Sequence, residues 1–286
     1  MKKNKFKKNL KLDELIKIYS KLLLDNNIKS AYLDVLIVLE NILHISRTHI
    51  LLNNDIVLSE SQFKLFRKYL NKRIAHKPIS QILGFSYFYD IKFIINKNVL
   101  QPRPETENMI TEIQNIIIKD NTLHTKKHIN ILDLGTGSGN IGIALSKNIK
   151  NCSVDMIDIS RKALRIAKLN AVIHTTDYNI MQNNLLDNIS FNYDIIVANL
   201  PYVPLKYSIN KDAKYEPKRA IFTKNNGIYL YQKMFNYLNK TPKPLFLLLE
   251  SLPNNQHQLI QVANKNGYIL YNISGYVSVF KNLLKS

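Results

Sequence analysis

The feature that most constrains the fold is a regular alternation of short apolar strands and amphipathic helices from Ile129 onward. The strand-like segments read INILDLG, SVDMIDI, YNIMQNN, YDIIVANLP, PLFLLLE, YILYNI and VSVFKNLL, and helical patterns separate most of them. Short apolar strands joined through helices predict a mainly parallel sheet that helices cover on both faces. We therefore expect an α/β, Rossmann-like domain that binds its ligands beyond the carboxyl ends of the strands.

The chain before this region follows a helical pattern. Tyr32, Val35 and Leu39 recur at spacings of three and four, and Ser59 with Gln62 forms a capping-box start for a later helix. The stretch from 81 to 107 is aromatic and β-branched around Tyr89-Asp90, which predicts a hairpin. A further helix is expected from 106 to 119. We predict a helical N-terminal domain at 1–78, a β-hairpin linker at 79–103 and the α/β domain at 104–286.

Composition limits the partners and the compartment. The chain has 40 Lys+Arg against 21 Asp+Glu, a net charge of +19 that attracts polyanions and allows weak contact with nucleic acid or the ribosome. The lysines are spread over the whole length, so general composition explains part of this charge. A single cysteine excludes a disulfide framework. No segment approaches the roughly 20 apolar residues of a membrane span. We expect a soluble cytoplasmic protein without membrane contact.

A glycine-rich turn, DLGTGSGNIGIA, follows the first strand of the α/β region. Gly135, Gly137 and Gly139 permit tight turns and close approach of a ligand to the backbone. Such a turn alone is weak evidence, because it also occurs as a plain connection. The next strand ends at Asp158, 19 positions after Gly139, close to the roughly 20 expected for a carboxylate that binds ribose hydroxyls. The alternative is that Asp158 is only a favourable charge before a helix N-terminus.

Both NAD and S-adenosylmethionine have a ribose that fits Asp158. Asp133, directly before the loop, would disfavour an anionic pyrophosphate and favour a cationic ligand. The sequence therefore favours S-adenosylmethionine, and we expect Asp133 to lie near its positive charge.

The segment DIIVANLPYVP ends a predicted buried strand with polar and aromatic residues. If this strand lies beside the glycine turn, the Asn199 side-chain oxygen and the Leu200 carbonyl can accept both hydrogens of an amide or aromatic amine. The nitrogen lone pair would then point at a sulfonium methyl group. Pro201 confines Leu200 to extended geometry, and Tyr202 can stack on a planar acceptor. Positioning and fixed dipoles then provide catalysis without an acid–base pair or a metal. An ordinary proline turn is the alternative.

Three blocks resemble the HemK/PrmC family of protein-(glutamine-N5) methyltransferases that act on peptide chain release factors. They are HKPISQILGFSYFY with LQPRPETE, ILDLGTGSGNIGIAL, and DIIVANLPYVP with KYEPKRAIF. The resemblance implies a class I methyltransferase domain and S-adenosylmethionine at Gly135, Thr136, Gly137, Ser138, Gly139, Asp158 and Asn199, with Asn183 or Asn184 near adenine. It also implies that Asn199, Leu200, Pro201 and Tyr202 bind the glutamine of a Gly-Gly-Gln motif, and that the helical domain contacts the release factor.

Other functions stay open at this stage. The form NLPY, with Leu200 where the HemK/PrmC family usually has proline, also occurs in ribosomal RNA adenine dimethyltransferases. Amino-methylating DNA enzymes and a non-catalytic binding module are further alternatives. His124 and His128 have no neighbouring cysteine or carboxylate cluster, so no metal site is expected. Arg103 and Glu105 are equally consistent with a functional role or with anchoring the turn.

Overall fold

The computed structural model describes residues 10–53, 55–187, 189, 192–207 and 211–283. The chain divides into two compact units. One comprises Met1–Gly84 with Asn210–Tyr215, and the other comprises Phe85–Ile209 with Glu216–Ser286. The first unit therefore includes a short segment that comes from the middle of the second in sequence. None of the helices within the described ranges is long and apolar enough to cross a membrane.

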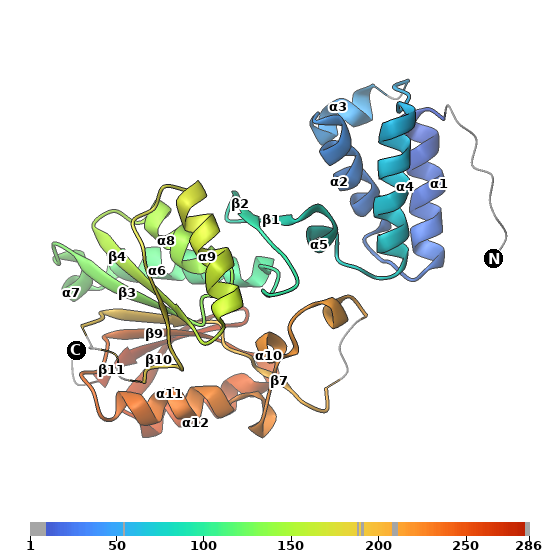
Figure 1. The fold of residues 1–286 in the computed structure, drawn as a ribbon. Helices are drawn as coiled ribbons and strands as arrows, with labels where there is room; N and C mark the ends of the chain where they lie inside the picture. The colour runs from blue at the N-terminus through green and yellow to red at the C-terminus, as the bar shows by residue number, and fades with distance from the viewer. Residues whose placement is uncertain (1–9, 54, 188, 190–191, 208–210, 284–286) are drawn as a thin grey trace. The chain divides into compact units, whose positions relative to one another are not determined.

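The first unit is helical (Figure 1). Its helices are α1 (Leu12–Asp25), α2 (Ala31–Leu43), α3 (Arg47–Leu52), α4 (Glu60–Ile74) and α5 (Ile79–Leu83), with the 3-10 turn η2 (Asp212–Tyr215). The apolar faces of α1, α2 and α4 form one core, in which the Tyr19 and Phe66 rings meet edge to face at 4.9 Å. The predicted capping box is confirmed, because the Ser59 hydroxyl accepts from the Gln62 N–H and the Gln62 side chain accepts from the Ser59 N–H.

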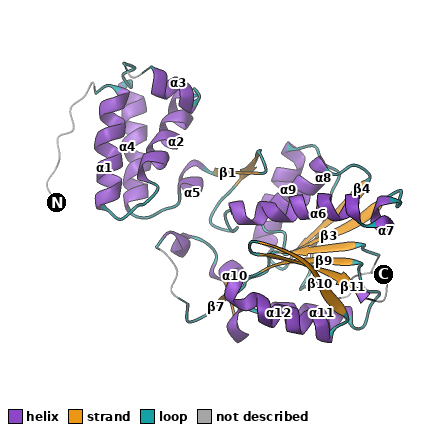
Figure 2. Ribbon diagram, turned by 180° about the vertical axis from the view of Figure 1, so that it is seen from behind, coloured by secondary structure: helices purple, strands orange, loops and turns teal. Residues whose placement is uncertain are grey.

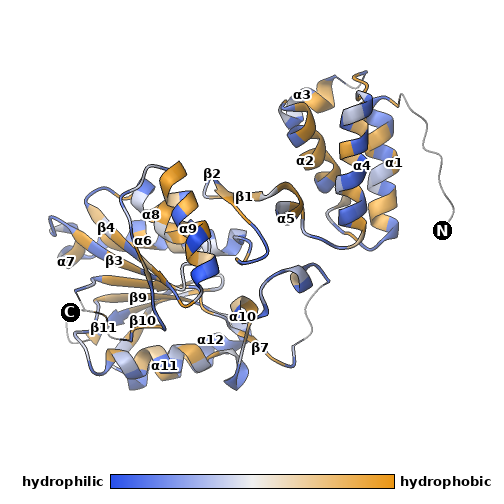
Figure 3. Cartoon of the chain, viewed as in Figure 1, coloured by the Kyte–Doolittle hydropathy of each residue, from blue (hydrophilic) through white to orange (hydrophobic). Residues whose placement is uncertain are grey.

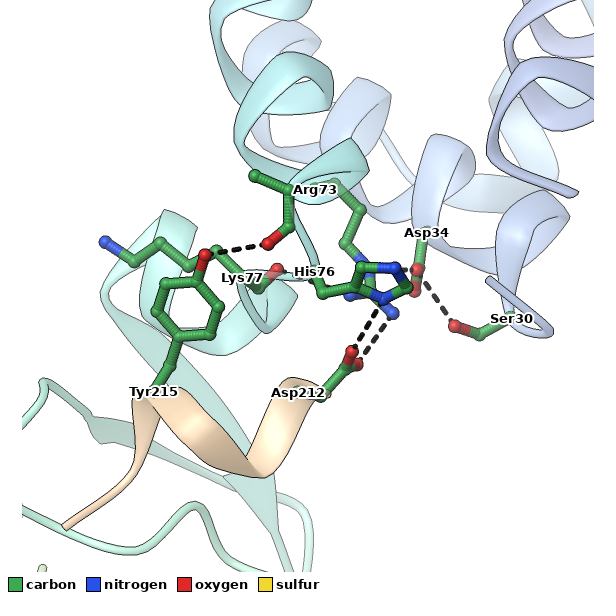
Figure 4. A network of polar contacts seen from close by, with 8 residues as sticks. Ser30, Asp34, Arg73, His76, Lys77, Asp212 and Tyr215 are labelled. Atoms are coloured by element: carbon green, nitrogen blue, oxygen red, sulfur yellow. Dashed lines mark hydrogen bonds and ion pairs between the residues drawn. The ribbon is translucent and has the colours of Figure 1, made fainter. Parts of the chain in front are cut away.

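A buried ion network fastens η2 within this unit (Figure 4). The Arg73 guanidinium, 5% exposed, donates from Nε to Asp34 Oδ2 at 2.6 Å and pairs through Nη2 with Asp212 Oδ2 at 2.9 Å. The Tyr215 hydroxyl donates to the Ala75 carbonyl at 2.7 Å. Burial raises the pKa of Asp34, and Arg73 offsets this only in part. Arg73 is therefore the shared partner of two carboxylates from distant parts of the chain.

The second unit is an α/β layer structure (Figures 1 and 2). Its central sheet has the order β10-β11-β9-β6-β3-β4-β5. The strands are β3 (Ile129–Leu134), β4 (Cys152–Asp158), β5 (Asn179–Gln182), β6 (Ile195–Ala198), β9 (Phe246–Glu250), β10 (Tyr268–Ser274) and β11 (Val277–Asn282). Strands β9, β6, β3, β4 and β5 are parallel, whereas β11 and β10 continue the sheet antiparallel. The predicted α/β fold is confirmed.

Helices cover both faces of this sheet. On one face, α6 (Asn108–Lys119), α8 (Asn140–Asn148) and α9 (Arg161–Ile173) share a core with β3 and β4. On the other, α11 (Tyr229–Leu238) and α12 (Pro253–Lys265) pack on β6 and β9. Every residue of β6 and β9 is buried, which explains why these strands read as continuous apolar runs rather than alternating ones. In Figure 3 the central strands are correspondingly hydrophobic, and the helices carry mixed faces.

The remaining elements are short. They are the hairpin β1 (Phe85–Phe88) and β2 (Ile91–Ile94), η1 (Pro104–Glu107), α7 (Asn121–His124), β7 (Val203–Pro204), α10 (Lys218–Ile221), β8 (Phe222–Thr223) and η3 (Asn225–Gly227). The hairpin is antiparallel, and its turn lies at Tyr89-Asp90 as predicted. Both turn residues have positive φ, with values of 49° and 60°. A two-residue hairpin turn of the I′ type requires this conformation.

The order of the sheet reverses at β3. The chain runs from β3 outward to β4 and β5, and then returns to β6 on the opposite side of β3. Such a switch point leaves a crevice at the carboxyl ends of the strands, because the connections diverge there. The crevice between β3 and β6 is thus the position where a ligand site is expected.

Candidate functional site

A cavity of about 180 Å³ lies at this switch point, entirely within the second unit. Nine of the sequence-predicted residues line it: Gly135, Thr136, Gly137, Ser138, Asp158, Asn184, Asn199, Leu200 and Pro201. Two others, Gly139 and Tyr202, are described by the structure but are not among its lining residues. The cavity brings residues from the ends of β3, β4, β5 and β6 to one place, as the parallel arrangement requires.

The glycine turn after β3 is shaped by close packing. Gly135 has φ of +81°, and a Cβ added there would lie 2.9 Å from Leu200 Cδ2. A larger residue at Gly135 would therefore push aside the end of the Leu200 side chain and would strain the backbone. Gly139 also has φ of +81°, but its neighbours are Ile143 and Ala167. Gly139 thus permits close approach of α8 and α9, and it is not among the residues that line the cavity.

Asp158 is held at the end of β4 by main-chain donors. Its Oδ2 accepts from the Gly137 N–H at 3.0 Å, and its Oδ1 accepts from the Ser160 N–H at 2.7 Å. Burial raises the pKa of Asp158, and these two bonds lower it in part, as does the charge of Arg219. Each carboxylate oxygen can accept more than one hydrogen bond. Asp158 is therefore oriented and still able to accept from ribose hydroxyls.

Asp133 has a different position from the one expected. Its side chain is completely buried beneath the glycine turn and does not line the cavity. Oδ2 accepts from the Thr136 hydroxyl at 2.6 Å and from the Gly142 N–H at 2.9 Å. Burial raises the pKa of Asp133 to about 7. The expectation that Asp133 neighbours a cationic ligand is thus corrected, because Oδ2 organises the turn from inside.

The segment from Asn183 to Leu185 lines the cavity beyond β5. Asn183 Nδ2 donates to the Asp187 carbonyl at 2.6 Å, while Asn183 Oδ1 accepts from the Asn184 N–H at 2.9 Å. Asn183 is therefore occupied in shaping the turn. No such internal bond engages the side chain of Asn184 in the described part of the chain, which favours Asn184 as the residue available to a ligand.

Asn199 follows β6 and faces the cavity with its amide group oriented by a neighbour. Asn199 Nδ2 donates to the Thr106 hydroxyl at 3.1 Å, so the amide oxygen Oδ1 is the atom left for a ligand. Leu200 is 4% exposed, and its N–H donates to the Tyr231 hydroxyl at 3.3 Å. The main chain of the NLPY segment is therefore fixed from the side of α11.

Tyr202 does not line the cavity. Its hydroxyl donates to Glu250 Oε1 at 2.9 Å, and the ring packs against the core formed by β6, β9 and α11. Burial and the Glu250 carboxylate raise the pKa of Tyr202. The lining of the cavity therefore does not include the Tyr202 ring, which was expected to stack on the acceptor.

Several residues that the sequence did not indicate also contribute to the site. Thr106, Arg219 and Leu230 line the cavity, and Tyr231 lies beneath it. Thr106 stands in the block PRPETE, whose pattern predicts a turn but no contact for the Thr106 hydroxyl. Arg103 lines the cavity and pairs with the buried carboxylate of Glu216. Arg103 therefore has both an anchoring contact and access to a ligand.

The cavity suits S-adenosylmethionine in its donor and acceptor groups. The turn at Gly135 brings backbone close to the ligand space, and Asp158 offers carboxylate oxygens at the end of the neighbouring strand. Leu100, Ile159 and Leu185 supply apolar surface for a planar base. The residues present therefore fit a nucleoside with a ribose diol. Within the described residues, no cluster of three or more histidine, cysteine or carboxylate side chains is placed to hold a metal ion.

Two family models match the chain. Residues 14–84 match the PrmC N-terminal domain, and residues 117–214 match the methyltransferase small domain. The release factor glutamine methyltransferase of Flavobacterium psychrophilum is 38% identical over 208 residues, which are 71% of this chain and 72% of that protein. The release factor glutamine methyltransferase of Lactococcus lactis is 36% identical over 180 residues, which are 62% of this chain and 64% of that protein.

Longer and more distant proteins also match. The bifunctional methyltransferase of Rickettsia typhi is 31% identical over 82% of this chain, and the chain spans 49% of that protein's length. Among solved structures, the hMettl16 catalytic domain in complex with a MAT2A 3′UTR hairpin has a TM-score of 0.52 at 12% identity, covering 81% of this chain and 84% of that one. At this identity the likeness concerns the fold alone.

Proposed function

Since the chain belongs to the release factor glutamine methyltransferase (HemK/PrmC) family, we propose that it methylates the side-chain amide nitrogen of a release-factor glutamine. The acceptor is the glutamine of the Gly-Gly-Gln motif, and the methyl donor is S-adenosylmethionine. Membership rests on a relative that is 38% identical and covered over 72% of its length.

Bound S-adenosylmethionine supplies an electrophilic methyl group on a sulfonium. Asp158 binds the ribose hydroxyls through its carboxylate, and the turn from Gly135 to Gly139 lets the ligand approach the main chain. Asn184 lies near the adenine. This assignment is supported by the position of these residues around one cavity, with the exception of Gly139, which acts through the packing of α8.

The observation that carries the proposal is the orientation of Asn199. An amide nitrogen is a poor nucleophile because its lone pair is delocalised into the carbonyl group. The Asn199 Oδ1 and Leu200 carbonyl oxygens accept its two hydrogens and favour a pyramidal nitrogen with its lone pair toward the methyl group. The donation from Asn199 Nδ2 to Thr106 supports this role, because it leaves Oδ1 as the acceptor on the cavity side. Preorganised acceptors of this kind act without reorganisation during the reaction.

Pro201 and Tyr202 complete the acceptor site in this proposal. Pro201 restricts the preceding Leu200 to extended backbone geometry, which helps to fix the Leu200 carbonyl. Tyr202 is anchored through its hydroxyl on Glu250, and in this proposal its ring stacks on the planar amide of the glutamine. The helical unit is proposed to recognise the body of the release factor. We further propose a cytoplasmic location and weak, salt-sensitive contact with the ribosome through the basic surface.

A direct test compares two acceptors in the same assay. Purified protein is incubated with S-adenosylmethionine carrying a labelled methyl group and with either a release factor or ribosomal RNA. The proposal predicts label in the release factor and its location on the Gly-Gly-Gln glutamine by mass spectrometry. Label in RNA adenine, with none in protein, would support the adenine methyltransferase instead. Binding of S-adenosylmethionine without transfer to either acceptor would indicate a non-catalytic module.

A further inference from the structure

We infer that Asn170 is a positioning residue that joins the hairpin of β1 and β2 to the glycine turn of the cofactor site. The inference rests on the proposed function, because it takes S-adenosylmethionine as the ligand of that turn. It deepens that function by assigning a role to a side chain outside the cavity lining. Asn170 acts through the main chain of Ser138, which does line the cavity.

The Asn170 side chain is fully buried in the second unit, and its polar atoms are bonded to main-chain groups. Oδ1 accepts from the Ile94 N–H at 2.7 Å. Nδ2 donates to the Ile94 carbonyl at 3.2 Å and to the Ser138 carbonyl at 2.8 Å. A side-chain amide has two N–H hydrogens, so both are used. One side chain therefore ties together two segments that are far apart in the sequence.

The hairpin lies beside α9 in the second unit (Figure 1). Its two strands form a sheet of their own, and a lone two-stranded hairpin is only marginally stable. Within a strand, the N–H and the C=O of one residue point to the same side. Asn170 therefore takes the place that a third strand would occupy beside Ile94. A second bond comes from His174 in the turn after α9, whose Nε2 donates to the Lys92 carbonyl at 2.8 Å.

The face of α9 that carries Asn170 also supports the glycine turn. Ala163, Ala167 and Asn170 follow one another at spacings of four and three, so they lie on one face of the helix. Ala163 lines the cavity, and a Cβ added at Gly139 would lie 3.3 Å from Ala167. Asn170 adds the bond to the Ser138 carbonyl. This face of the helix thus runs from the cavity, past the turn, to the hairpin.

Loss of the Asn170 amide would leave buried main-chain groups of Ile94 and Ser138 without their partners. The glycine turn would then adopt other conformations for part of the time. Only molecules with the turn in its binding conformation take up the ligand, so the apparent affinity falls in proportion to their fraction. We therefore expect the Asn170 amide to affect the binding of S-adenosylmethionine.

The effect is reciprocal. If release of the hairpin from Asn170 weakens the binding of S-adenosylmethionine, then bound S-adenosylmethionine opposes release of the hairpin by the same factor. The hairpin follows α5 of the helical unit directly in the sequence. Asn170 would thus connect cofactor binding to the segment that leads to the unit proposed to recognise the release factor.

Asn170→Ala and His174→Ala form a matched pair for the test. Both remove bonds to the hairpin, but only Asn170→Ala also removes the bond to the glycine turn. S-adenosylmethionine binding is measured by calorimetry under conditions in which urea unfolding shows each protein to be folded. We expect binding about fivefold or more weaker for Asn170→Ala, and within about twofold of the parent for His174→Ala. A loss of stability alone would not change the affinity of the folded protein.

Hydrogen exchange in the parent tests the link without any substitution, and it decides the matter if Asn170→Ala does not fold. The Ile94 N–H is donated to Asn170 Oδ1, so its exchange reports release of the hairpin from α9. We expect saturating S-adenosylmethionine to slow this exchange about fivefold or more. The His49 N–H in the helical unit, bonded to the Ser46 hydroxyl, is the control and should exchange at an unchanged rate.

Three results would overturn the inference and leave the proposed function intact. They are an Asn170→Ala variant that binds S-adenosylmethionine as tightly as the parent, an equal loss of affinity in both variants, and exchange at Ile94 that does not respond to the cofactor. A parent protein that binds no S-adenosylmethionine would overturn both the inference and the proposed function.

Discussion

Asp133 should make the stability of this protein fall as the pH rises from acid to neutral. Its side chain is fully buried, and burial raises the pKa of the carboxyl group to about 7, against 3.8 for an ordinary aspartate. Between these values the folded protein retains a proton that the unfolded chain has lost. The stabilising contribution is therefore fully present below the unfolded pKa and is lost as the pH rises through the folded one.

The difference between 3.8 and about 7 sets the size of the effect. At about 1.4 kcal/mol for each unit, the ionised Asp133 costs up to roughly 4 kcal/mol of folding free energy at pH 8 relative to pH 4. Asparagine removes this dependence because it is neutral at every pH. Its amide oxygen can also accept the bonds from Thr136 and Gly142 that Asp133 Oδ2 now accepts.

The assay is urea unfolding of the parent and of Asp133→Asn at pH 5 and pH 8. Asp177→Asn, the same chemical change at an exposed aspartate, is the control. The difference in unfolding free energy between Asp133→Asn and the parent should shift in favour of the variant by about 2–4 kcal/mol on going to pH 8. A difference that is the same at both pH values would refute the reasoning, because it would mean that Asp133 keeps one charge state throughout.

Three further perturbations test separate parts of the molecule. Asp158→Ala removes the proposed acceptor for the ribose hydroxyls. Because each of these hydrogen bonds is worth about 1.5–3 kcal/mol, calorimetry should show at least tenfold weaker S-adenosylmethionine binding. An unchanged affinity would exclude the assignment of Asp158 to the ribose. Leu200→Pro retains the carbonyl but loses the N–H bond to Tyr231 and part of a buried side chain, and single-turnover transfer should change less than about tenfold. A gain of several decades over an inert parent would show that Leu200 prevents the chemistry. Arg73→Met leaves Asp34 buried without its cation and should destabilise the helical unit by about 3–5 kcal/mol, measured by chemical unfolding; a change below about 1 kcal/mol would contradict the buried network.

Local patterns in the sequence were sufficient for much of the site. Gly135 and Asp158 were found because a strand, a tight turn and the next strand end have a fixed spacing in this fold. Asn199 was identified because hydrophobic packing does not explain a polar amide side chain at the end of a buried strand. These residues lie around one cavity in the structure.

The parts that sequence reasoning missed depend on contacts between distant segments. Thr106 meets Asn199 across 93 positions, and Tyr202 meets Glu250 across 48. Nothing local to Glu250 distinguishes it from an ordinary polar residue at the end of a strand. The prediction for Asp133 was wrong for a related reason. Sequence spacing shows that Asp133 lies near the turn, but it does not show whether the side chain points into the cavity or beneath it.

The most direct test of the central claim is the site of methylation in a release factor. Parent protein and Asn199→Ala are each incubated with a release factor and S-adenosylmethionine, and the peptide containing Gly-Gly-Gln is analysed by mass spectrometry. The account predicts a methyl group on the glutamine side-chain nitrogen with the parent, its absence with Asn199→Ala, and nearly equal cofactor affinity for the two proteins. The account would be contradicted if the glutamine stayed unmethylated with an active preparation of the parent protein. It would also be contradicted if Asn199→Ala methylated the glutamine to the same extent as the parent.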